Sequence, residues 1–141
     1  MVVTPEIWEV VAFPFSPDAK GERLGEFRNW LDAFSEGGEL SVAEDPHLKP
    51  QDAMLARVDP VDAEFWSIRV TDPEQTPGIR SLGAFADKDT FVALTWDYRE
   101  LIGEFDDEVA TAHAAWVDLF GAEVPHSGDH IDDYLTNYYS V

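Results

Sequence analysis

The chain contains no cysteine among its 141 residues. A disulfide scaffold, a thiolate zinc site and a cysteine nucleophile are therefore excluded, and the composition suits a reducing compartment. Long apolar runs are also missing. Nowhere do about 18 apolar residues follow one another, and the residues after Met1 lack the basic and apolar segments of a signal peptide. We expect a cytoplasmic protein that does not act at a membrane.

Positive charge is scarce. The chain has 9 Lys and Arg against 29 Asp and Glu, a formal net charge of −20, and no Lys or Arg follows Arg99. Such a charge repels phosphates and anionic lipids over a Debye length of about 8–10 Å. Two interpretations stay open. Either the whole proteome is acidic, as in a salt-adapted organism, or the acidic surface mimics nucleic acid or docks on a basic partner.

The motifs of common cofactor enzymes are also absent from the sequence. There is no Gly-rich phosphate loop, no Gly-x-Ser-x-Gly elbow and no dinucleotide-binding fingerprint. We therefore expect no cofactor. Hydrophobic residues nevertheless make up 45% of the chain and aromatic residues 13%, which is enough apolar surface for a core. The length is typical of one domain, so residues 1–141 are expected to fold as a single domain.

The first part of the chain contains one strand pattern and one helix pattern. Residues 7–13 are rich in β-branched and aromatic side chains, which predicts a strand. A helix is predicted from residues 16–18, where a serine, a proline and an acidic residue precede an apolar stripe, to the glycines at 37–38. Residues 39–62 show little periodicity, and their pattern allows only a short helix at 51–57.

Three apolar runs follow at residues 65–70, 79–85 and 90–96. A short polar loop joins the second run to the third, so the sequence predicts an antiparallel meander with a hairpin. An acidic first turn at 106–108 begins a second helix that ends at Gly121, and a third, shorter helix is expected from Asp129. The predicted fold class is α+β, with a small, mainly antiparallel sheet of four or five strands and two or three packed helices.

Three segments carry a resemblance to a known family. They are Phe65-Trp66-Ser67-Ile68-Arg69, Ile79-Arg80-Ser81-Leu82 and Asp89-Thr90-Phe91-Val92-Ala93-Leu94. The first is similar to the Trp-Glu-Leu-Arg strand of the RelE/ParE toxin superfamily, the second to its Tyr-Arg-Val-Leu strand, and the third to the strand that leads into its basic turn. The resemblance is greatest to the HigB-like branch and covers approximately residues 24–120.

The resemblance implies a function and a set of site residues. Toxins of this superfamily cleave messenger RNA without a metal ion, on the ribosome or free, and use Arg, Lys, His or Tyr side chains to orient the ribose 2′-hydroxyl and to stabilise the pentavalent phosphate. By resemblance, Arg69 and Arg80 would face the phosphate, and Tyr98 and Arg99 would stand at the basic turn. RNA or the ribosome would then be the partner, and the site would need a concave basic face.

The chain departs from the family in charge. Residues 98–100 stand where a pair of lysines is usual, and the basic helix is missing. Two functions therefore stay open: a RelE/HigB-like toxin of a toxin–antitoxin or mobile-element system, RNA-cleaving or degenerate, and a non-enzymatic acidic protein, such as a phage or mobile-element inhibitor, that binds a basic protein partner. If Arg69 and Arg80 share one open face they form an anion site; if each is paired with a carboxylate, they are ordinary surface residues.

A second cluster of polar residues lies near the C-terminus. His126, Asp129 and His130 carry imidazole nitrogens and a carboxylate, which are ligands of zinc and iron. Gly128 opposes one continuous helix through both histidines, and Ser127 or Asp129 can instead cap a helix start. A metal site and a helix start therefore remain alternative interpretations of this segment.

Overall fold

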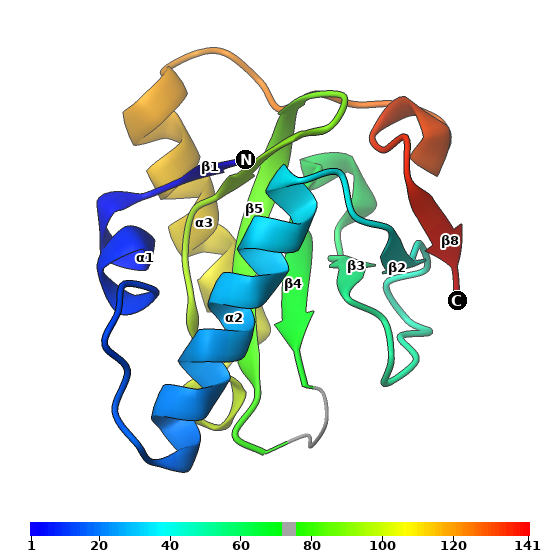
Figure 1. Cartoon of the computed structure of the whole chain (residues 1–141). Helices are drawn as coiled ribbons and strands as arrows, with labels where there is room; N and C mark the ends of the chain where they lie inside the picture. Colours follow the sequence, from blue (N-terminus) through cyan, green and yellow to red (C-terminus); the bar gives the residue numbers. More distant parts are fainter. Residues whose placement is uncertain (72–75) are drawn as a thin grey trace.

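The structure of the chain is a computed structural model, and it describes residues 1–71 and 76–141 (Figure 1). The α-helices are α1 (Pro5–Val10), α2 (Ala19–Ser35) and α3 (Phe105–Phe120). The strands are β1 (Val2–Val3), β2 (Leu40–Ala43), β3 (Leu55–Arg57), β4 (Trp66–Val70), β5 (Ile79–Asp87), β6 (Thr90–Ala93), β7 (Asp97–Tyr98) and β8 (Tyr138–Ser140). Three single turns of 3-10 helix are η1 (Val61–Ala63), η2 (Arg99–Leu101) and η3 (Ile131–Asp133).

The described strands form one mixed sheet of eight strands. Their order is β1-β6-β5-β4-β3-β2-β8, and β7 pairs with β5 beyond the end of β6. The β3–β4, β4–β5 and β5–β6 pairs are antiparallel, whereas the β1–β6, β2–β3 and β2–β8 pairs are parallel. The predicted sheet of four or five mainly antiparallel strands is therefore wrong in size and in type, although helices and strands are both present.

The sequence underestimates the size of the sheet because the outer strands are too short to show a strand pattern. β1 has 2 residues, and β3 and β8 have 3 each. β2 and β3 are buried along their whole length, so polar and apolar residues do not alternate in them. A parallel pair also lacks the tight turn that marks a hairpin. Residues 51–57, where a short helix was allowed, contain β3 instead.

The centre of the sheet agrees with the sequence. The three apolar runs form β4, β5 and β6, and the last two make the expected antiparallel hairpin, with an irregular register between Phe85 and Asp87. Along β6, Phe91 and Ala93 pack into one core cluster while Val92 packs into another. Successive residues of a strand point to opposite faces, so both faces of the sheet are covered, as expected.

Helices α1 and α2 cover one face of the sheet and α3 covers the other (Figure 1). The predicted helix at residues 16–38 is confirmed as α2, and its N-cap is Asp18, whose carboxylate accepts the N–H of Gly21 at 2.8 Å. The buried line of α3 is formed by Ala112 and Trp116, and the helix ends as predicted at Gly121, which has a φ of 60°.

Two other predicted elements are wrong. Residues 7–13, expected as a strand, contain most of α1 instead. Ile7 and Val11 lie one helical turn apart and are both fully buried, and Pro5 occupies the first turn, where its missing N–H has no cost. The segment from Asp129, expected as a helix, makes only the single turn η3 before it continues into β8.

Strands β5 and β6 approach each other too closely at Gly83 for a side chain. A Cβ there would lie 2.0 Å from the carbonyl oxygen of Val92 and 2.7 Å from the ring of Phe91. We expect Gly83→Ala to lower the free energy of unfolding by about 1–3 kcal/mol, measured by urea denaturation. Gly103→Ala is the matched control, because a Cβ at Gly103 would meet no atom within 4 Å. Equal losses in the two variants would contradict this packing.

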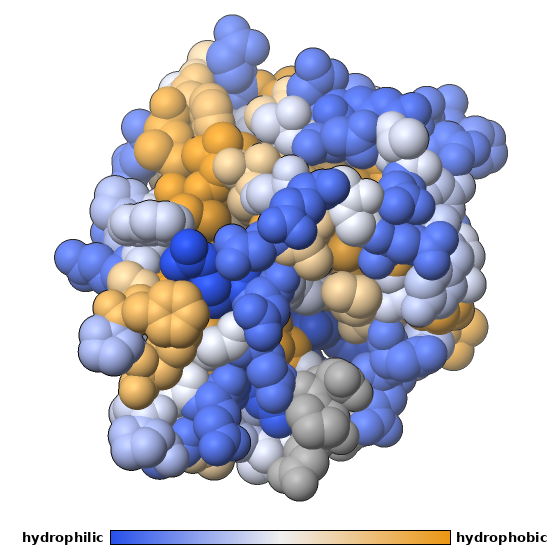
Figure 2. All heavy atoms as spheres, in the orientation of Figure 1, coloured by the Kyte–Doolittle hydropathy of each residue, from blue (hydrophilic) through white to orange (hydrophobic). Residues whose placement is uncertain are grey.

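Hydrophilic side chains cover most of the face drawn in Figure 2, and hydrophobic side chains gather at its left, where α1 and β1 lie. Trp8 and Phe13 are among the exposed apolar residues of the chain, and the guanidinium of Arg28 lies 5.0 Å from the ring of Trp8. Among the helices that the structure describes, none combines the length and the apolar composition needed to cross a membrane.

Candidate anion-binding site

Arg69 and Arg80 are direct neighbours on the two central strands. β4 and β5 pair them in register, and residues directly opposite each other point to the same face of a sheet. Two residues from Arg80 along β5, Leu82 packs into the core cluster that contains Trp116 of α3. The two arginines therefore share one face, and it is the face that α3 covers.

Two more cations join this pair. Lys49 comes from the connection between β2 and β3, and Arg99 begins η2. The Nζ atom of Lys49 lies 5.7 Å from the centre of the Phe105 ring, and the guanidinium carbon of Arg99 lies 6.0 Å from it. Phe105 is the first residue of α3 and is half-buried. We call Lys49, Arg69, Arg80 and Arg99 the cationic cluster.

Burial and, after it, mutual repulsion lower pKa values within the cationic cluster. Burial, followed by the charges of Arg69 and Arg99, lowers the pKa of Arg80 to about 10. Burial, followed by the charges of Arg69 and Arg80, also lowers the pKa of the Lys49 ammonium group. Each charged form is therefore less favourable here than in water. A bound anion would relieve this repulsion, which is the electrostatic property of an anion site.

The cationic cluster is not neutralised by ion pairs. Within residues 1–71 and 76–141, no carboxylate oxygen lies within 4.0 Å of its charged nitrogens. Arg69 donates from Nη1 to the carbonyl oxygen of Pro50 at 2.6 Å, and Arg80 donates to that of Ile79 at 3.2 Å, so both guanidinium groups keep further donors. The other three arginines are each bonded to a carboxylate, in the pairs Arg23–Glu26, Arg28–Asp32 and Arg57–Glu64.

Glu100 is a carboxylate at the border of the cationic cluster. Its Oε1 atom accepts the backbone N–H of Gly78 at 3.1 Å. Although burial raises the pKa of Glu100, this hydrogen bond and the charges of Arg80 and Arg99 lower it overall. A carboxylate with a lowered pKa is a weak general base at neutral pH. The arrangement is therefore better suited to bind an anion and to stabilise negative charge than to abstract a proton.

Tyr98, which the resemblance placed in the site, lies on the opposite face of the sheet. In the β5–β7 pair, Tyr98 stands opposite Ile79, whereas Arg80 stands opposite Asp97. The Tyr98 ring belongs to the core cluster beneath α2, and its hydroxyl donates to the carbonyl oxygen of Lys20 at 3.2 Å. Of the four predicted site residues, the structure brings together Arg69, Arg80 and Arg99 and leaves Tyr98 out.

Comparison of the chain with models of protein families, with curated proteins and with solved structures found no match. The description of the site therefore rests on its own geometry.

Lys49 and Phe105 are the site residues that the sequence did not indicate. Lys49 lies in the segment without periodicity, where no pattern predicted its position in space. The segment reaches the site because β3 pairs with β4, which places the residues before β3 beside the end of β4. The one local signal is that Lys49 is among only three lysines in the chain. Phe105 precedes the acidic first turn at residues 106–108, and no local pattern marks it as a site residue.

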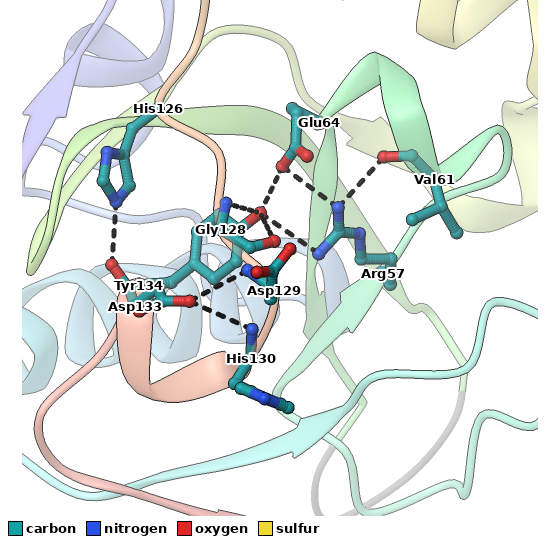
Figure 3. A network of polar contacts seen from close by, with 9 residues as sticks. All are labelled: Arg57, Val61, Glu64, His126, Gly128, Asp129, His130, Asp133 and Tyr134. Atoms are coloured by element: carbon teal, nitrogen blue, oxygen red, sulfur yellow. Dashed lines mark hydrogen bonds and ion pairs between the residues drawn. The ribbon is translucent and has the colours of Figure 1, made fainter.

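The structure does not assemble a metal site from His126, Asp129 and His130. The Nε2 atom of His126 lies 2.8 Å from the carbonyl oxygen of Asp133, and the ring of His130 points away from the other two side chains (Figure 3). The carboxylate of Asp133 accepts the N–H groups of Asp129 and His130 at 2.9 and 3.1 Å, which closes η3. Over the described ranges, no group of three His, Asp or Glu residues is placed to hold a metal ion.

A buried polar network lies next to this turn (Figure 3). The Nη2 atom of Arg57 lies 3.0 Å from Oε2 of Glu64, and the two side chains are only 9% and 13% exposed. The hydroxyl of Tyr134 donates to the same Oε2 atom and accepts the N–H of Gly128 at 2.8 Å. The guanidinium of Arg57 also lies 4.7 Å from the ring of Trp66. The charged groups of Arg57 and Glu64 neutralise each other, so the network offers no charge to a ligand. Its hydrogen bonds to Tyr134 instead hold the C-terminal segment against the sheet.

Proposed function

We propose that the chain binds single-stranded RNA through the cationic cluster, as a RelE/HigB-like protein that is either an RNA-cleaving toxin or a degenerate, RNA-binding one. One observation carries this proposal. In a chain with 29 carboxylates, Arg69, Arg80 and Arg99 converge with Lys49 and form no ion pair among the described residues, whereas each of the other three arginines does.

Energetics support an external anion at this cluster. Neighbouring arginines that form no ion pair repel one another, and each hydrogen bond from a guanidinium to a phosphate contributes about 1.5–3 kcal/mol. The net charge of −20 opposes the approach of RNA at long range, but at an ionic strength of about 0.15 M this repulsion is screened beyond about 8 Å. The choice of RNA among phosphate ligands comes from the resemblance of β4, β5 and β6 to strands of the RelE/ParE superfamily.

Replacement of Arg80 tests the binding proposal. We expect Arg80→Gln to weaken the binding of a fluorescent single-stranded RNA by about 10- to 100-fold, because one or two charged hydrogen bonds to phosphate are lost. The measurement is fluorescence anisotropy at about 0.15 M salt. Arg28→Gln is the matched control, since Arg28 is paired with Asp32 outside the cluster. Equal affinities of the two variants, or no binding by the unmodified chain, would contradict the proposal.

Cleavage is tested separately from binding. Labelled RNA is incubated with the chain in the presence of a chelator, and induced expression is followed by growth and by transcript integrity. Transcript cleavage and growth arrest that both disappear in Arg80→Gln would favour an RNA-cleaving toxin, in which the cluster stabilises the charge on the pentavalent phosphate. Binding without cleavage would favour the degenerate form.

A second candidate function follows from the acidic surface of α3. Asp106, Asp107 and Asp118 are exposed, and none of them forms an ion pair with a described residue. Such a surface suits a non-enzymatic protein that binds a basic partner. A basic protein that co-purifies with the chain, is removed by salt and is retained by Arg80→Gln would favour this function over RNA binding.

A further inference from the structure

Carboxylates border the cationic cluster on the side of β7. Arg80 of β5 stands opposite Arg69 on β4 and opposite Asp97 on β7, so the three side chains share one face of the sheet. The carboxylate of Asp97 accepts the backbone N–H of the next residue at 2.8 Å and forms no ion pair with a described residue. Burial, followed by the charges of Asp97 and Asp107, raises the pKa of Glu108 on α3. Negative charge therefore accumulates directly beside the row of arginines.

Carboxylates also border the cluster on the side of β3. Burial lowers the pKa of Arg69, and the nearby charge of Asp52 opposes this shift. In the same way, the charge of Asp59 opposes the burial and the repulsion that lower the pKa of Lys49. Asp52 and Asp59 are exposed, and neither forms an ion pair with a described residue. We call Asp52, Asp59, Asp97 and Glu100 the border carboxylates.

Two kinds of phosphate group occur in RNA, and they differ in charge and in surroundings. A phosphodiester within the strand carries one negative charge on two free oxygens and has a phosphate neighbour on each side. A phosphate monoester at the end of a strand carries a charge of about −1.5 to −2 at pH 7 on three free oxygens. Neighbouring phosphates of a strand are closer together than the Debye length of about 8 Å. A diester at the cluster therefore brings two further charges toward the border carboxylates, whereas a terminal monoester brings one.

The donors of the cationic cluster match the monoester better than the diester. Arg69 and Arg80 lie in register and keep free guanidinium donors, which suffice for two phosphate oxygens. A third oxygen gives Lys49 or Arg99 an acceptor as well. The additional negative charge also offsets more of the repulsion among the four cations. The cluster and its border together favour a compact group of high charge over an extended strand of single charges.

We infer that the cationic cluster binds a phosphate monoester, supplied by the phosphorylated end of an RNA strand, in preference to a phosphodiester within the strand. The inference rests on the proposed function for the RNA, and on the cluster with its border carboxylates for the preference. It fits an RNA-binding protein better than one that cleaves within a strand, because such cleavage places a diester at the cluster. A free nucleoside monophosphate carries the same group, so the experiment separates these two sources.

The test compares oligouridines of equal length that carry a 5′-phosphate, a 3′-phosphate or a hydroxyl group at both ends. In calorimetric titrations at about 0.15 M salt, the unmodified chain should bind one of the phosphorylated oligomers about 10- to 100-fold more tightly than the unphosphorylated one, because the third oxygen adds a charged hydrogen bond. A phosphorylated trimer should bind within about twofold of a phosphorylated dodecamer, because internal phosphates add no contact. Equal affinities for all three oligomers would overturn the inference and leave RNA binding by the cluster intact.

Replacement of Lys49 locates the preference. Lys49→Gln removes one cation from the cluster and should weaken binding of the phosphorylated oligomer more than binding of the unphosphorylated one. Lys88→Gln is the matched control, because Lys88 is exposed and follows the end of β5 opposite to Arg80. A preference equally strong in both variants would contradict the assignment to the cluster. The preference itself is measured on the unmodified chain, so the test stands even if Lys49→Gln disturbs folding.

If the unmodified chain binds none of the oligomers, the proposed function fails and uridine monophosphate decides the inference. The side-chain Nε–Hε NMR signals of Arg69, Arg80 and Arg99 should then shift with uridine monophosphate and not with dimethyl phosphate, which is a diester. Such a result would assign the site to a free nucleotide. No shift with uridine monophosphate, or equal shifts with dimethyl phosphate, would overturn the inference.

Discussion

Replacement of Glu64 by alanine is expected to lower the free energy of unfolding by about 3–5 kcal/mol, because it leaves a buried guanidinium without its counter-charge. Arg57 and Glu64 are both nearly inaccessible to solvent, and the hydroxyl of Tyr134 would lose its acceptor at the same time. Urea denaturation followed by tryptophan fluorescence measures the change. This is the largest loss of stability that we expect from a single polar substitution in the chain.

The matched control for this prediction is Asp32→Ala. Asp32 is also paired with an arginine, Arg28, but its side chain is 54% exposed, and exposed pairs contribute only about 0–1 kcal/mol. A loss in Glu64→Ala no greater than in Asp32→Ala would show that the buried network does not hold the C-terminal segment against the sheet.

Neutralisation of both central arginines should separate binding from stability. We expect Arg69→Gln combined with Arg80→Gln to weaken RNA binding by at least about 100-fold, since charged contacts to phosphate contribute about 1.5–3 kcal/mol each. The same double variant should unfold at a higher urea concentration than the unmodified chain, because like charges directly opposite each other in a sheet are destabilising. Anisotropy and urea denaturation measure the two effects.

The sign of the stability effect follows from the pKa of Arg80. Burial and the neighbouring arginines lower that pKa to about 10, so the charged form is less favourable in the folded state than in the unfolded chain. The resulting loss of stability is fully present at every pH below about 10, and it would be relieved only as the pH rises above 10 toward the higher pKa that arginine has in the unfolded chain. A less stable double variant would mean that Arg69 and Arg80 are structural.

The parts of the fold that the sequence predicted are those with long local patterns. α2 has an apolar stripe and a capping aspartate, and β4, β5 and β6 are joined by short connections, so periodicity and turns define them. β2 and β8 were not predicted because they are short and pair with each other across a long stretch of the chain. Leu40 stands opposite Tyr138, almost a hundred positions away. α1 was assigned to a strand because its β-branched residues outweighed the helical spacing of Ile7 and Val11.

In the site, too, only the positions that depend on local pairing could be predicted from the sequence. The resemblance placed Arg69 and Arg80 in one site, but the sequence left open whether the two side chains share a face. That outcome depends on the register of one antiparallel pair, which pairs the two arginines directly. Tyr98 was misplaced by a single residue of alternation, since neighbours in a strand point to opposite faces. Lys49 is brought to the cationic cluster by the parallel β2–β3 pair and by the contact of β3 with β4. Pairing between strands that are distant in the chain produces no pattern in the local sequence.

Arginine side-chain NMR tests the cationic cluster most directly. The chain has six arginines, so the Nε–Hε signals can be assigned by single substitutions. On addition of a short single-stranded RNA at about 0.15 M salt, the signals of Arg69, Arg80 and Arg99 should shift together and saturate, while that of Arg28 should stay in place. Unchanged signals of Arg69, Arg80 and Arg99 at saturating RNA, or equal shifts in Arg28, would contradict a phosphate site on this face of the sheet.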